Sequence, residues 1–266
     1  MRPRKRFGQH FLHDPAVIER IVAAIAPLRS DALVEIGPGP AALTDPLLQR
    51  VDRLDVIEID RDLAAALRAR HADRAALRVH EGDALEFDFA ALARERGRKL
   101  RVVGNLPYNI STPLLFRLLY AADAIVDMHF MLQKEVVDRI AAVPGNRQYG
   151  RLGVMLAPRV RATKLMDIGP GAFRPPPQVW SAIVRLEIRA DTPQWAALPQ
   201  FSRVVAAAFG QRRKTLRNAL GGLLGAAQIA AVGIDPGARA ETLAPADFGR
   251  LAQAVAASEV AATAPL

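Results

Sequence analysis

The feature that most constrains the fold of this chain is a regular alternation of short apolar runs with stretches of helical period. Each apolar run is short enough for a buried strand and is followed by a glycine or polar turn. Such alternation is typical of a parallel sheet with helices packed on both faces. We therefore expect an α/β, Rossmann-like fold whose buried strands are residues 32–36, 54–59, 77–80, 101–104 and 125–132.

The pattern changes in the second half of the chain. Two further strand-like runs, 163–168 and 182–188, have little helix between them, which predicts an antiparallel hairpin at the end of the sheet. From about residue 190 only helical patterns remain, so a sheet domain over 1–189 and a small all-helical domain over 190–266 are expected. The predicted helices are 15–28 before the sheet, then 198–209, 211–224, 226–232 and 245–257, with a frayed alanine-rich tail over 256–266.

Composition excludes several classes of function. The chain of 266 residues has no cysteine, which excludes disulfides, cysteine-ligated zinc and cysteine-ligated iron–sulfur clusters. Its five histidines show no metal-ligand spacing apart from the pair His10 and His13, so no metal is expected. No apolar run approaches the roughly 18 residues of a membrane span, and we expect a soluble, cytoplasmic protein.

Positive charge is gathered in three segments. The net charge is +9, and the basic clusters fall in residues 2–6, 94–101 and 212–217. A basic protein with clustered cations is a candidate for binding a polyanion such as a nucleic acid. An arginine-rich composition gives the same charge without any such partner, so charge alone leaves both interpretations open.

A glycine turn follows the first predicted strand. Gly37 and Gly39 allow the backbone to approach a ligand closely at the carboxyl end of the sheet. Glu58 ends the second strand, where a carboxylate can bind the two hydroxyls of a ribose. This arrangement matches a dinucleotide fingerprint, so a nicotinamide-dependent enzyme is one interpretation.

Two features favour a nucleoside cofactor that lacks a pyrophosphate. A pyrophosphate binds to backbone N–H groups at the start of a helix, and Pro38 and Pro40 each lack that group. Glu35 also places an anion where phosphates would lie, although it is compatible with an ammonium group. S-adenosylmethionine carries a ribose and an ammonium group but no phosphate, and it therefore fits these residues better than NAD.

Polar residues also end the third and fourth predicted strands. Asp83 can accept a hydrogen bond from an adenine amine, although a Gly-Asp turn is common after any strand. The fourth strand ends in the tetrapeptide 105–108, Asn-Leu-Pro-Tyr, in which the amide can accept from an exocyclic amine and the Tyr108 ring can stack on a base. A plain strand and turn is the alternative. Because parallel strands share one carboxyl edge, these residues converge with Glu58 and predict a binding site there.

Several longer motifs extend over nearly the whole chain. They are residues 6–12, 34–44, 57–60, 82–85, 105–108, 131–135, 173–179 and 209–218. With these motifs the chain resembles the ribosomal RNA adenine N6-dimethyltransferases, and most of all the small-subunit (16S) enzymes of bacteria. The glycine turn recurs across class I methyltransferases, whereas the first and the last three motifs are much more specific.

The resemblance implies an S-adenosylmethionine-dependent enzyme that dimethylates N6 of two adjacent adenosines in a loop near the 3′ end of 16S rRNA, within the small subunit. It implies a methyltransferase domain over 1–189 with a basic N-terminal arm, and an RNA- or ribosome-binding domain over 190–266. The chain departs from the commonest family pattern at His10, where Asn is frequent, and at Ala41, where the third glycine of the turn would stand. The implied cofactor contacts are His10, Leu12, Gly37, Gly39, Glu58, Ile59, Asp83 and Asn105.

The expected catalytic residues are Asn105, Leu106, Pro107, Tyr108 and Phe173. An adenine N6 amine is a poor nucleophile because its lone pair is delocalised into the ring. The Asn105 side-chain oxygen and the Leu106 carbonyl would accept its hydrogens and free the lone pair, while Pro107 fixes the turn. Tyr108 would stack on one face of the adenine and Phe173 on the other. A core position beside the prolines 175–177 explains Phe173 equally well.

RNA is expected to bind two basic segments. Drawn as one helix, residues 205–223 carry an apolar stripe with cations beside it, and a solvated helix face is the alternative. We expect a monomer, because no long apolar stripe remains unassigned. A large-subunit rRNA adenine methylase and a small-subunit assembly factor whose binding matters more than its methylation are the competing functions. The expected RNA contacts are Arg4, Lys5, Arg6, Arg212, Arg213, Lys214 and Arg217.

Overall fold

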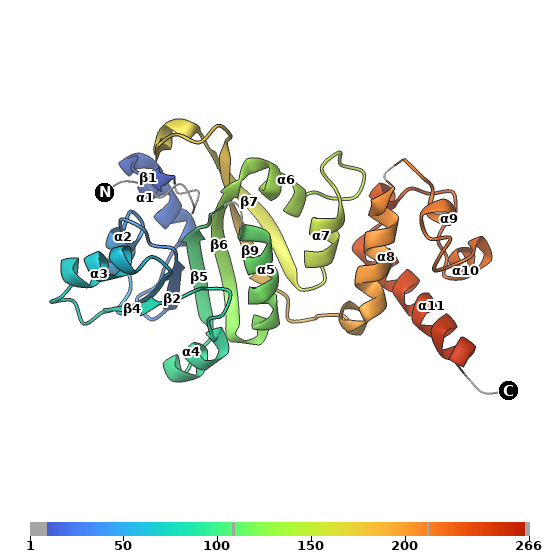
Figure 1. Ribbon diagram of the computed structural model, residues 1–266, viewed down its shortest axis with the longest axis horizontal. Helices are drawn as coiled ribbons and strands as arrows, with labels where there is room; N and C mark the ends of the chain where they lie inside the picture. The colour runs from blue at the N-terminus through green and yellow to red at the C-terminus, as the bar shows by residue number, and fades with distance from the viewer. Residues whose placement is uncertain (1–9, 108–109, 212, 264–266) are drawn as a thin grey trace. The chain divides into compact units, whose positions relative to one another are not determined.

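The computed structural model describes residues 10–107, 110–211 and 213–263 of the chain (Figure 1). Internal contacts divide the chain into two compact units. The first comprises Met1–Val137 and Ala162–Ile188, and the second comprises Asp138–Arg161 and Arg189–Leu266. The last passage between the units therefore lies beside the predicted division at 189/190. The segment 138–161 also groups with the second unit, which the periodicity of the sequence did not indicate.

A seven-stranded sheet forms the centre of the first unit. Its strands are β2 (Ala32–Ile36), β3 (Leu54–Glu58), β4 (Leu77–Glu81), β5 (Leu100–Asn105), β6 (Ile125–Gln133), β7 (Val160–Ile168) and β9 (Ser181–Ile188). They lie in the order β4-β3-β2-β5-β6-β9-β7. The first five are paired in parallel, and β9 runs antiparallel to β6. The α/β prediction is confirmed, and the two predicted hairpin strands are neighbours, with β9 inserted between β6 and β7.

Helices connect the strands and cover the sheet. One face is packed against α1 and α2, whose Ile21, Val22 and Leu47 share a core with Leu33 and Val103 of the strands. Alternate strand residues point to the opposite face, where α5 lies in front of β6 in Figure 1. The helices of this unit are α1 (Pro15–Ile25), α2 (Thr44–Leu48), α3 (Arg61–Arg70), α4 (Phe89–Arg96) and α5 (Ser111–Tyr120).

Helix α1 ends three residues before the predicted end at residue 28. Asp14 caps its start by accepting hydrogen bonds from the backbone of Ala16 and Val17. At the other end Ala26 takes a left-handed backbone conformation with φ of 47°. Pro27 follows and lacks the N–H that another turn would need. The last carbonyl groups of α1 therefore need partners outside the helix.

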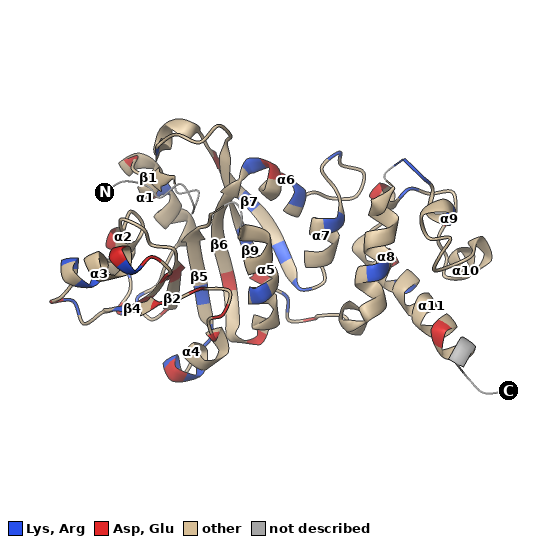
Figure 2. Ribbon diagram, viewed as in Figure 1, with Lys and Arg blue, Asp and Glu red and all other residues tan. Residues whose placement is uncertain are grey.

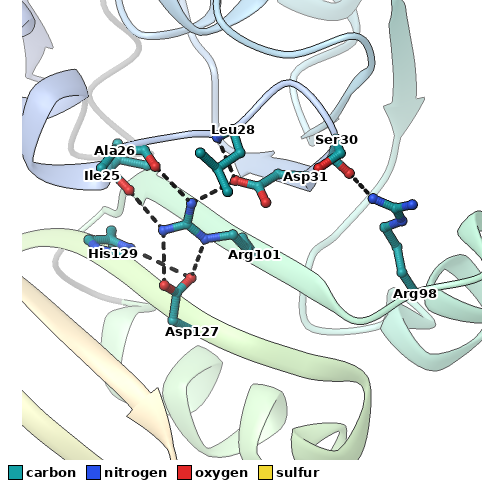
Figure 3. Close-up of polar contacts among 9 residues, drawn as sticks. All are labelled: Ile25, Ala26, Leu28, Ser30, Asp31, Arg98, Arg101, Asp127 and His129. Atoms are coloured by element: carbon teal, nitrogen blue, oxygen red, sulfur yellow. Dashed lines mark hydrogen bonds and ion pairs between the residues drawn. The ribbon is translucent and has the colours of Figure 1, made fainter.

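A partly buried arginine of β5 supplies those partners (Figure 3). Arg101 donates to the carbonyls of Ile25 at 2.8 Å and Ala26 at 3.2 Å. It also donates to both carboxylate oxygens of Asp127 at 2.9 Å, and to Asp31 at 2.7 Å. Although burial acts to lower it, the hydrogen bonds to these carboxylates raise the pKa of Arg101. The arginine thus fastens α1 to β5 and β6 with every donor engaged in a charge-assisted or backbone bond.

The second unit is all-helical apart from its loops. Phe201, Val205, Leu220, Phe248 and Leu251 are buried in its core. Its elements are α7 (Arg151–Leu156), α8 (Pro199–Gly210), α9 (Leu216–Ala219), α10 (Ala226–Ala231), α11 (Pro245–Thr263) and the 3₁₀ turns Gln194–Ala197 and Ala240–Thr242, while α6 (Lys134–Ile140) leads into it. None of the helices in the described ranges is long and apolar enough to cross a membrane.

Two helix predictions for this unit are wrong. The predicted helix 211–224 is broken, because α8 ends at Gly210 and α9 begins only at Leu216. The backbone N–H groups of Leu216 and Arg217 donate to carbonyls of residues 238 and 236, so a distant loop replaces the preceding turn of helix. The alanine-rich tail, expected to fray from 256, instead continues α11, where Glu259 accepts hydrogen bonds from α8.

Candidate active site

A cavity of about 330 Å³ lies at the carboxyl edge of the sheet in the first unit. Its volume falls within the range of sites for nucleosides and other small ligands. All eight predicted cofactor contacts line it, and so do Leu106, Pro107 and Phe173. Tyr108 lies outside the described residues. The structure thus brings these residues together around one cavity, while the role of each stays a prediction.

The glycine turn at the floor of the cavity has few backbone donors to offer. Gly37 and Gly39 take left-handed φ angles of 67° and 54°, which glycine adopts without strain. The N–H of Gly37 is bound to Ile57 O at 2.9 Å, and that of Gly39 to Glu58 Oε2 at 3.1 Å. Ala41 also takes a left-handed φ, of 74°, and its N–H closes a turn onto Pro38.

These bonds decide against a phosphate-binding turn. Within residues 37–41 the two prolines have no N–H, and the other three N–H groups are already engaged. A pyrophosphate would need several of these donors at the start of the helix. The turn therefore shapes the cavity and positions Glu58 rather than holding a phosphate group.

Two buried carboxylates project from the same face of the sheet into the cavity. Glu58 accepts a hydrogen bond from Asp60 N at 2.9 Å as well as from Gly39 N, and each of its oxygens can accept a further one. Burial raises the pKa of Glu58, against the lowering effect of these hydrogen bonds. Glu35 lies deeper and accepts from Thr44 Oγ1 at 2.7 Å. Burial raises the pKa of Glu35 from 4.5 to about 8, so this group is mostly neutral at pH 7.

The third acidic residue of the cavity lies on the turn that follows β4. Asp83 accepts a hydrogen bond from Leu85 N at 2.9 Å, which fixes the carboxylate at the cavity wall. Arg117 of α5 holds the same turn by donating to the carbonyls of Leu85 and Phe87 at 2.9 and 3.1 Å. The position of Asp83 therefore depends on α5 as well as on β4.

A short strap crosses one side of the cavity. It consists of β1 (Phe11–Leu12), which pairs antiparallel with β8 (Phe173–Arg174), together with residue 10 on one side and residue 13 on the other. The Phe11 ring lies against Gly39, where a Cβ atom would be only 3.4 Å from it. His13 N donates to Ala172 O at 2.9 Å. The strap thus joins the N-terminal arm to the glycine turn and to the segment that carries Phe173.

The residues expected to act on the base lie beside this strap. Asn105 ends β5 and donates from its side-chain nitrogen to His10 O at 3.2 Å. Leu106 is buried, and its N–H donates to Met131 O at 3.2 Å. The Phe173 side chain is 2% exposed and belongs to the sheet core while its ring also lines the cavity. Both alternatives considered for Phe173 from the sequence thus describe part of its environment.

Sequence reasoning missed some of the cavity lining. Phe11 and Ile110 line the cavity, yet neither was singled out. Phe11 stands inside the specific motif 6–12, so its place between two selected residues was a usable signal. Ile110 precedes α5 and carries no such signal. Among the residues that the structure describes, no group of three or more His, Cys, Asp or Glu side chains could hold a metal ion.

None of the predicted RNA contacts that the structure describes is among the residues that line this cavity, and the others lie outside the described residues. Arg213, Lys214 and Arg217 are exposed in the second unit, at and after the break between α8 and α9. Figure 2 shows cationic residues in this connecting segment. Arg212 and the arm residues Arg4, Lys5 and Arg6 lie outside the described residues. Arg213 and Lys214 therefore lie on the connection between α8 and α9, and Arg217 lies in the short helix α9, rather than all three on one continuous helix as the sequence predicted.

The fold and the site define a class of enzyme. Five strands of the sheet are parallel and β9 is inserted antiparallel beside β6. A glycine turn follows β2, an acidic residue ends β3 and another follows β4. This is the class I methyltransferase fold. A dimethyladenosine transferase from Plasmodium falciparum has a similar structure, with a TM-score of 0.78 at 25% identity over 91% of this chain and 96% of that one. The 23S rRNA methyltransferase ErmE is also similar, with a TM-score of 0.73 at 25% identity over 92% and 99% of the chains.

Sequence comparison identifies the family. Residues 1–257 match the family described as "Ribosomal RNA adenine dimethylase". The chain is 59% identical over 246 residues to "Ribosomal RNA small subunit methyltransferase A" of Methylococcus capsulatus, covering 92% of this chain and 95% of the relative. It is 55% identical to the protein of that name from Pseudomonas aeruginosa, covering 96% and 95%. The chain belongs to the ribosomal RNA adenine dimethylase family, and it is an S-adenosylmethionine-dependent methyltransferase.

Proposed function

We propose that this enzyme dimethylates N6 of two adjacent adenosines in a loop near the 3′ end of 16S rRNA, within the small ribosomal subunit or its precursor. The observation that carries the proposal is the convergence in one cavity of Glu58 and Asp83 with Asn105, because it sets groups for a nucleoside cofactor beside an acceptor for a base amine. The relatives named above are small-subunit methyltransferases and match over nearly their full length, which supports the choice of subunit.

The cavity fits S-adenosylmethionine by the chemistry of its walls. Glu58 is the acceptor for the ribose hydroxyls, and Asp83 is the acceptor for the adenine amine. Glu35 is the partner of the ammonium group of S-adenosylmethionine. In the free protein its carboxyl is mostly neutral, so no unpaired anion is buried there. The cofactor supplies an electrophilic methyl group to the site. The other proposed contacts are His10, Leu12, Gly37, Gly39, Ile59 and Asn105.

The chain's own contribution to the reaction is to hold the target amine. Asn105 Oδ1 and the Leu106 carbonyl accept the two N6 hydrogens, which moves the lone pair of the nitrogen out of conjugation. Pro107 fixes the turn that presents both acceptors. Tyr108 and Phe173 form the two walls against the faces of the adenine, which is reached in a single-stranded or flipped state. Placement of the two reacting groups supplies most of the rate, on the order of 7 kcal/mol.

Methyl transfer to defined substrates tests the proposed target. Purified enzyme is given immature small subunits, naked 16S rRNA and large subunits, and the methylated positions are mapped by reverse-transcription stops and mass spectrometry. We expect two adjacent dimethylated adenosines in the small subunit only. Methylation of 23S rRNA would instead favour the large-subunit alternative, which the fold does not exclude because ErmE has a similar structure.

The second candidate function is small-subunit assembly, for which binding rather than methylation would be the main task. An Asn105→Ala enzyme that still binds subunits separates the two. If it restores ribosome assembly in cells that lack the wild-type enzyme, binding is the main role, and if it does not, methylation is. We further propose a monomeric, cytoplasmic enzyme, and light scattering of the purified protein tests the oligomeric state.

The cations of the second unit are proposed to grip rRNA phosphates. Arg213, Lys214 and Arg217 are exposed, as a phosphate contact requires. Arg213→Glu with Arg217→Glu should weaken binding to small subunits and lower the salt slope of the affinity by about 0.7–0.9 for each lost contact. The matched control is Arg29→Glu with Arg53→Glu, which changes the net charge equally on the first unit. Equal loss in both double variants would mean a general charge effect and would refute the grip.

A further inference from the structure

One residue of the strap touches both elements that handle the base. The His10 ring bonds through Nδ1 to Pro175 O at 2.8 Å, across 165 residues of sequence. The His10 main-chain carbonyl accepts from the Asn105 side-chain nitrogen at 3.2 Å. Pro175 lies two residues after Phe173, whose ring lines the cavity. His10 therefore spans the distance between the end of β5 and the segment of β8.

In both hydrogen bonds the acceptor is a carbonyl oxygen, so the donor in each must be the nitrogen. A carbonyl oxygen only accepts, so His10 Nδ1 must carry a hydrogen when it faces Pro175 O. For the same reason the nitrogen end of the Asn105 amide must face His10 O, which turns Oδ1 away from the strap. Without that bond the amide could rotate and present its NH₂ group to a base amine, and two donors cannot bond to each other. The orientation of Asn105 thus depends on where residue 10 is held.

We propose that His10 is a positioning residue for methyl transfer: its ring anchors the strap to the segment that carries Phe173, and its carbonyl holds the Asn105 amide with the oxygen toward the target amine. The proposal rests on the role of Asn105 proposed above. His10 also lines the cavity as a proposed cofactor contact, so the two roles are separated by measuring kcat at saturating S-adenosylmethionine, where the rate no longer depends on cofactor affinity.

The test compares His10→Ala with His10→Asn and with a control in the same strap. An Asn side chain retains an N–H donor for Pro175 O. His13→Ala is the control, since His13 is exposed and its backbone, not its ring, bonds to Ala172. For each variant we measure kcat with small subunits at saturating S-adenosylmethionine. The cofactor Kd, by calorimetry, and the melting temperature are measured on the free enzyme.

We expect His10→Ala to lower kcat at saturating S-adenosylmethionine about tenfold, the scale of one lost hydrogen bond of positioning, in addition to any rise in the cofactor Kd from the lost side chain in the cavity. His10→Asn should recover most of the rate, and His13→Ala should match the wild type. A normal kcat in His10→Ala would overturn the proposal, and a weakened cofactor Kd beside it would leave His10 with the cofactor contact alone. Equal loss of rate in the Ala and Asn variants would also overturn it.

A second measurement tests the proposal even if the His10→Ala variant does not fold. The side-chain NH₂ resonances of Asn105, assigned by ¹⁵N-asparagine labelling and the Asn105→Ala variant, report the bond to His10 O directly. Relative to the wild type, these resonances should shift less in the folded His10→Asn variant than in a His10→Gly variant. Identical Asn105 resonances in the wild type and in these two variants would refute the proposal. If Asn105→Ala itself retained full turnover, the proposed function of Asn105 would fail instead, which separates the two failures.

Discussion

The two ends of one face of the sheet treat buried charge in opposite ways. At the amino end, Arg101 meets Asp127, Asp31 and two helix carbonyls, and burial is offset by paired charges. At the carboxyl end of the same face, Glu35 has one hydrogen bond, from Thr44, and burial keeps it mostly neutral. Arg101 and Asn105 lie on the same strand, about 13 Å apart by the rise of a β-strand. The paired charges at the amino end stabilise the fold, whereas the carboxylate at the carboxyl end has hydrogen-bonding capacity left for a ligand.

The largest effect is expected at the stabilising end. Arg101→Met should lower the free energy of unfolding by about 3–5 kcal/mol, because it leaves the partly buried carboxylates of Asp127 and Asp31 without their cation. Cofactor affinity at a temperature where the protein is folded should hardly change. Denaturant unfolding and calorimetry measure the two properties. The control is Arg98→Met, since Arg98 is exposed and its side chain donates to the carbonyl of Ser30 rather than to a carboxylate. A comparable loss of unfolding free energy in Arg101→Met and Arg98→Met would show that the paired charges at the amino end of the sheet have no special role in stability.

The next effect belongs to the ligand-binding end. Asn105→Ala should lower kcat by about 10²–10³-fold, the range found when one preorganised catalytic hydrogen-bonding group is removed. Binding to small subunits should change much less, because the amide acts mainly on the reacting nitrogen. Single-turnover methylation and subunit binding are measured in parallel. A large loss of binding with an unchanged rate would show that Asn105 holds the ground state instead.

Glu35 should lower the stability of the protein and raise its cofactor affinity as the pH rises. Its folded pKa of about 8 exceeds the usual 4.5, so the folded state binds the extra proton and stability falls as pH rises from 4.5 to 8. Glu35→Gln should abolish this dependence and stabilise the protein by about 3 kcal/mol at pH 7, from 1.36 kcal/mol per pKa unit.

The same substitution should weaken S-adenosylmethionine binding at pH 8 more than at pH 6. The reason is that the wild-type carboxylate becomes available to the ammonium group as the pH rises. Thermal unfolding and calorimetry across this pH range are the measurements. Identical pH profiles of stability for the wild type and Glu35→Gln would show that Glu35 is ionised throughout and would remove the contrast between the two ends.

The smallest effect is expected at Glu58. Glu58→Ala should weaken cofactor binding by about 1–3 kcal/mol, the scale of a hydrogen bond to a charged group. Glu58→Gln should lose less, since it retains an acceptor oxygen for Gly39 N or Asp60 N. Calorimetry with both variants gives the values, and melting temperatures show how far the glycine turn depends on this side chain. Cofactor affinity unchanged in the Ala variant would place the ribose elsewhere.

The sequence by itself determined the parallel sheet and the edge at which the site forms. Glu58, Asp83 and Asn105 each follow an apolar run, and parallel strands bring their carboxyl ends together whatever lies between them. This local pattern was enough to predict that Glu58, Asp83 and Asn105 share one cavity, whereas His10 and Leu12 were implied only by the family resemblance. It was also enough for the choice between a phosphate-free cofactor and a dinucleotide, because the two prolines of the turn are visible in the sequence.

Tertiary structure alone decided what depends on contacts between distant residues. The bond between His10 and Pro175, the bonds from Arg101 to the end of α1, and the packing of Phe173 join segments that no periodicity connects. The break before Leu216 has the same origin, because carbonyls of residues 236 and 238 take the N–H groups that a continuous helix would have used. Hydrophobic period reports which face of an element is buried, but it carries no information about the partner that buries it.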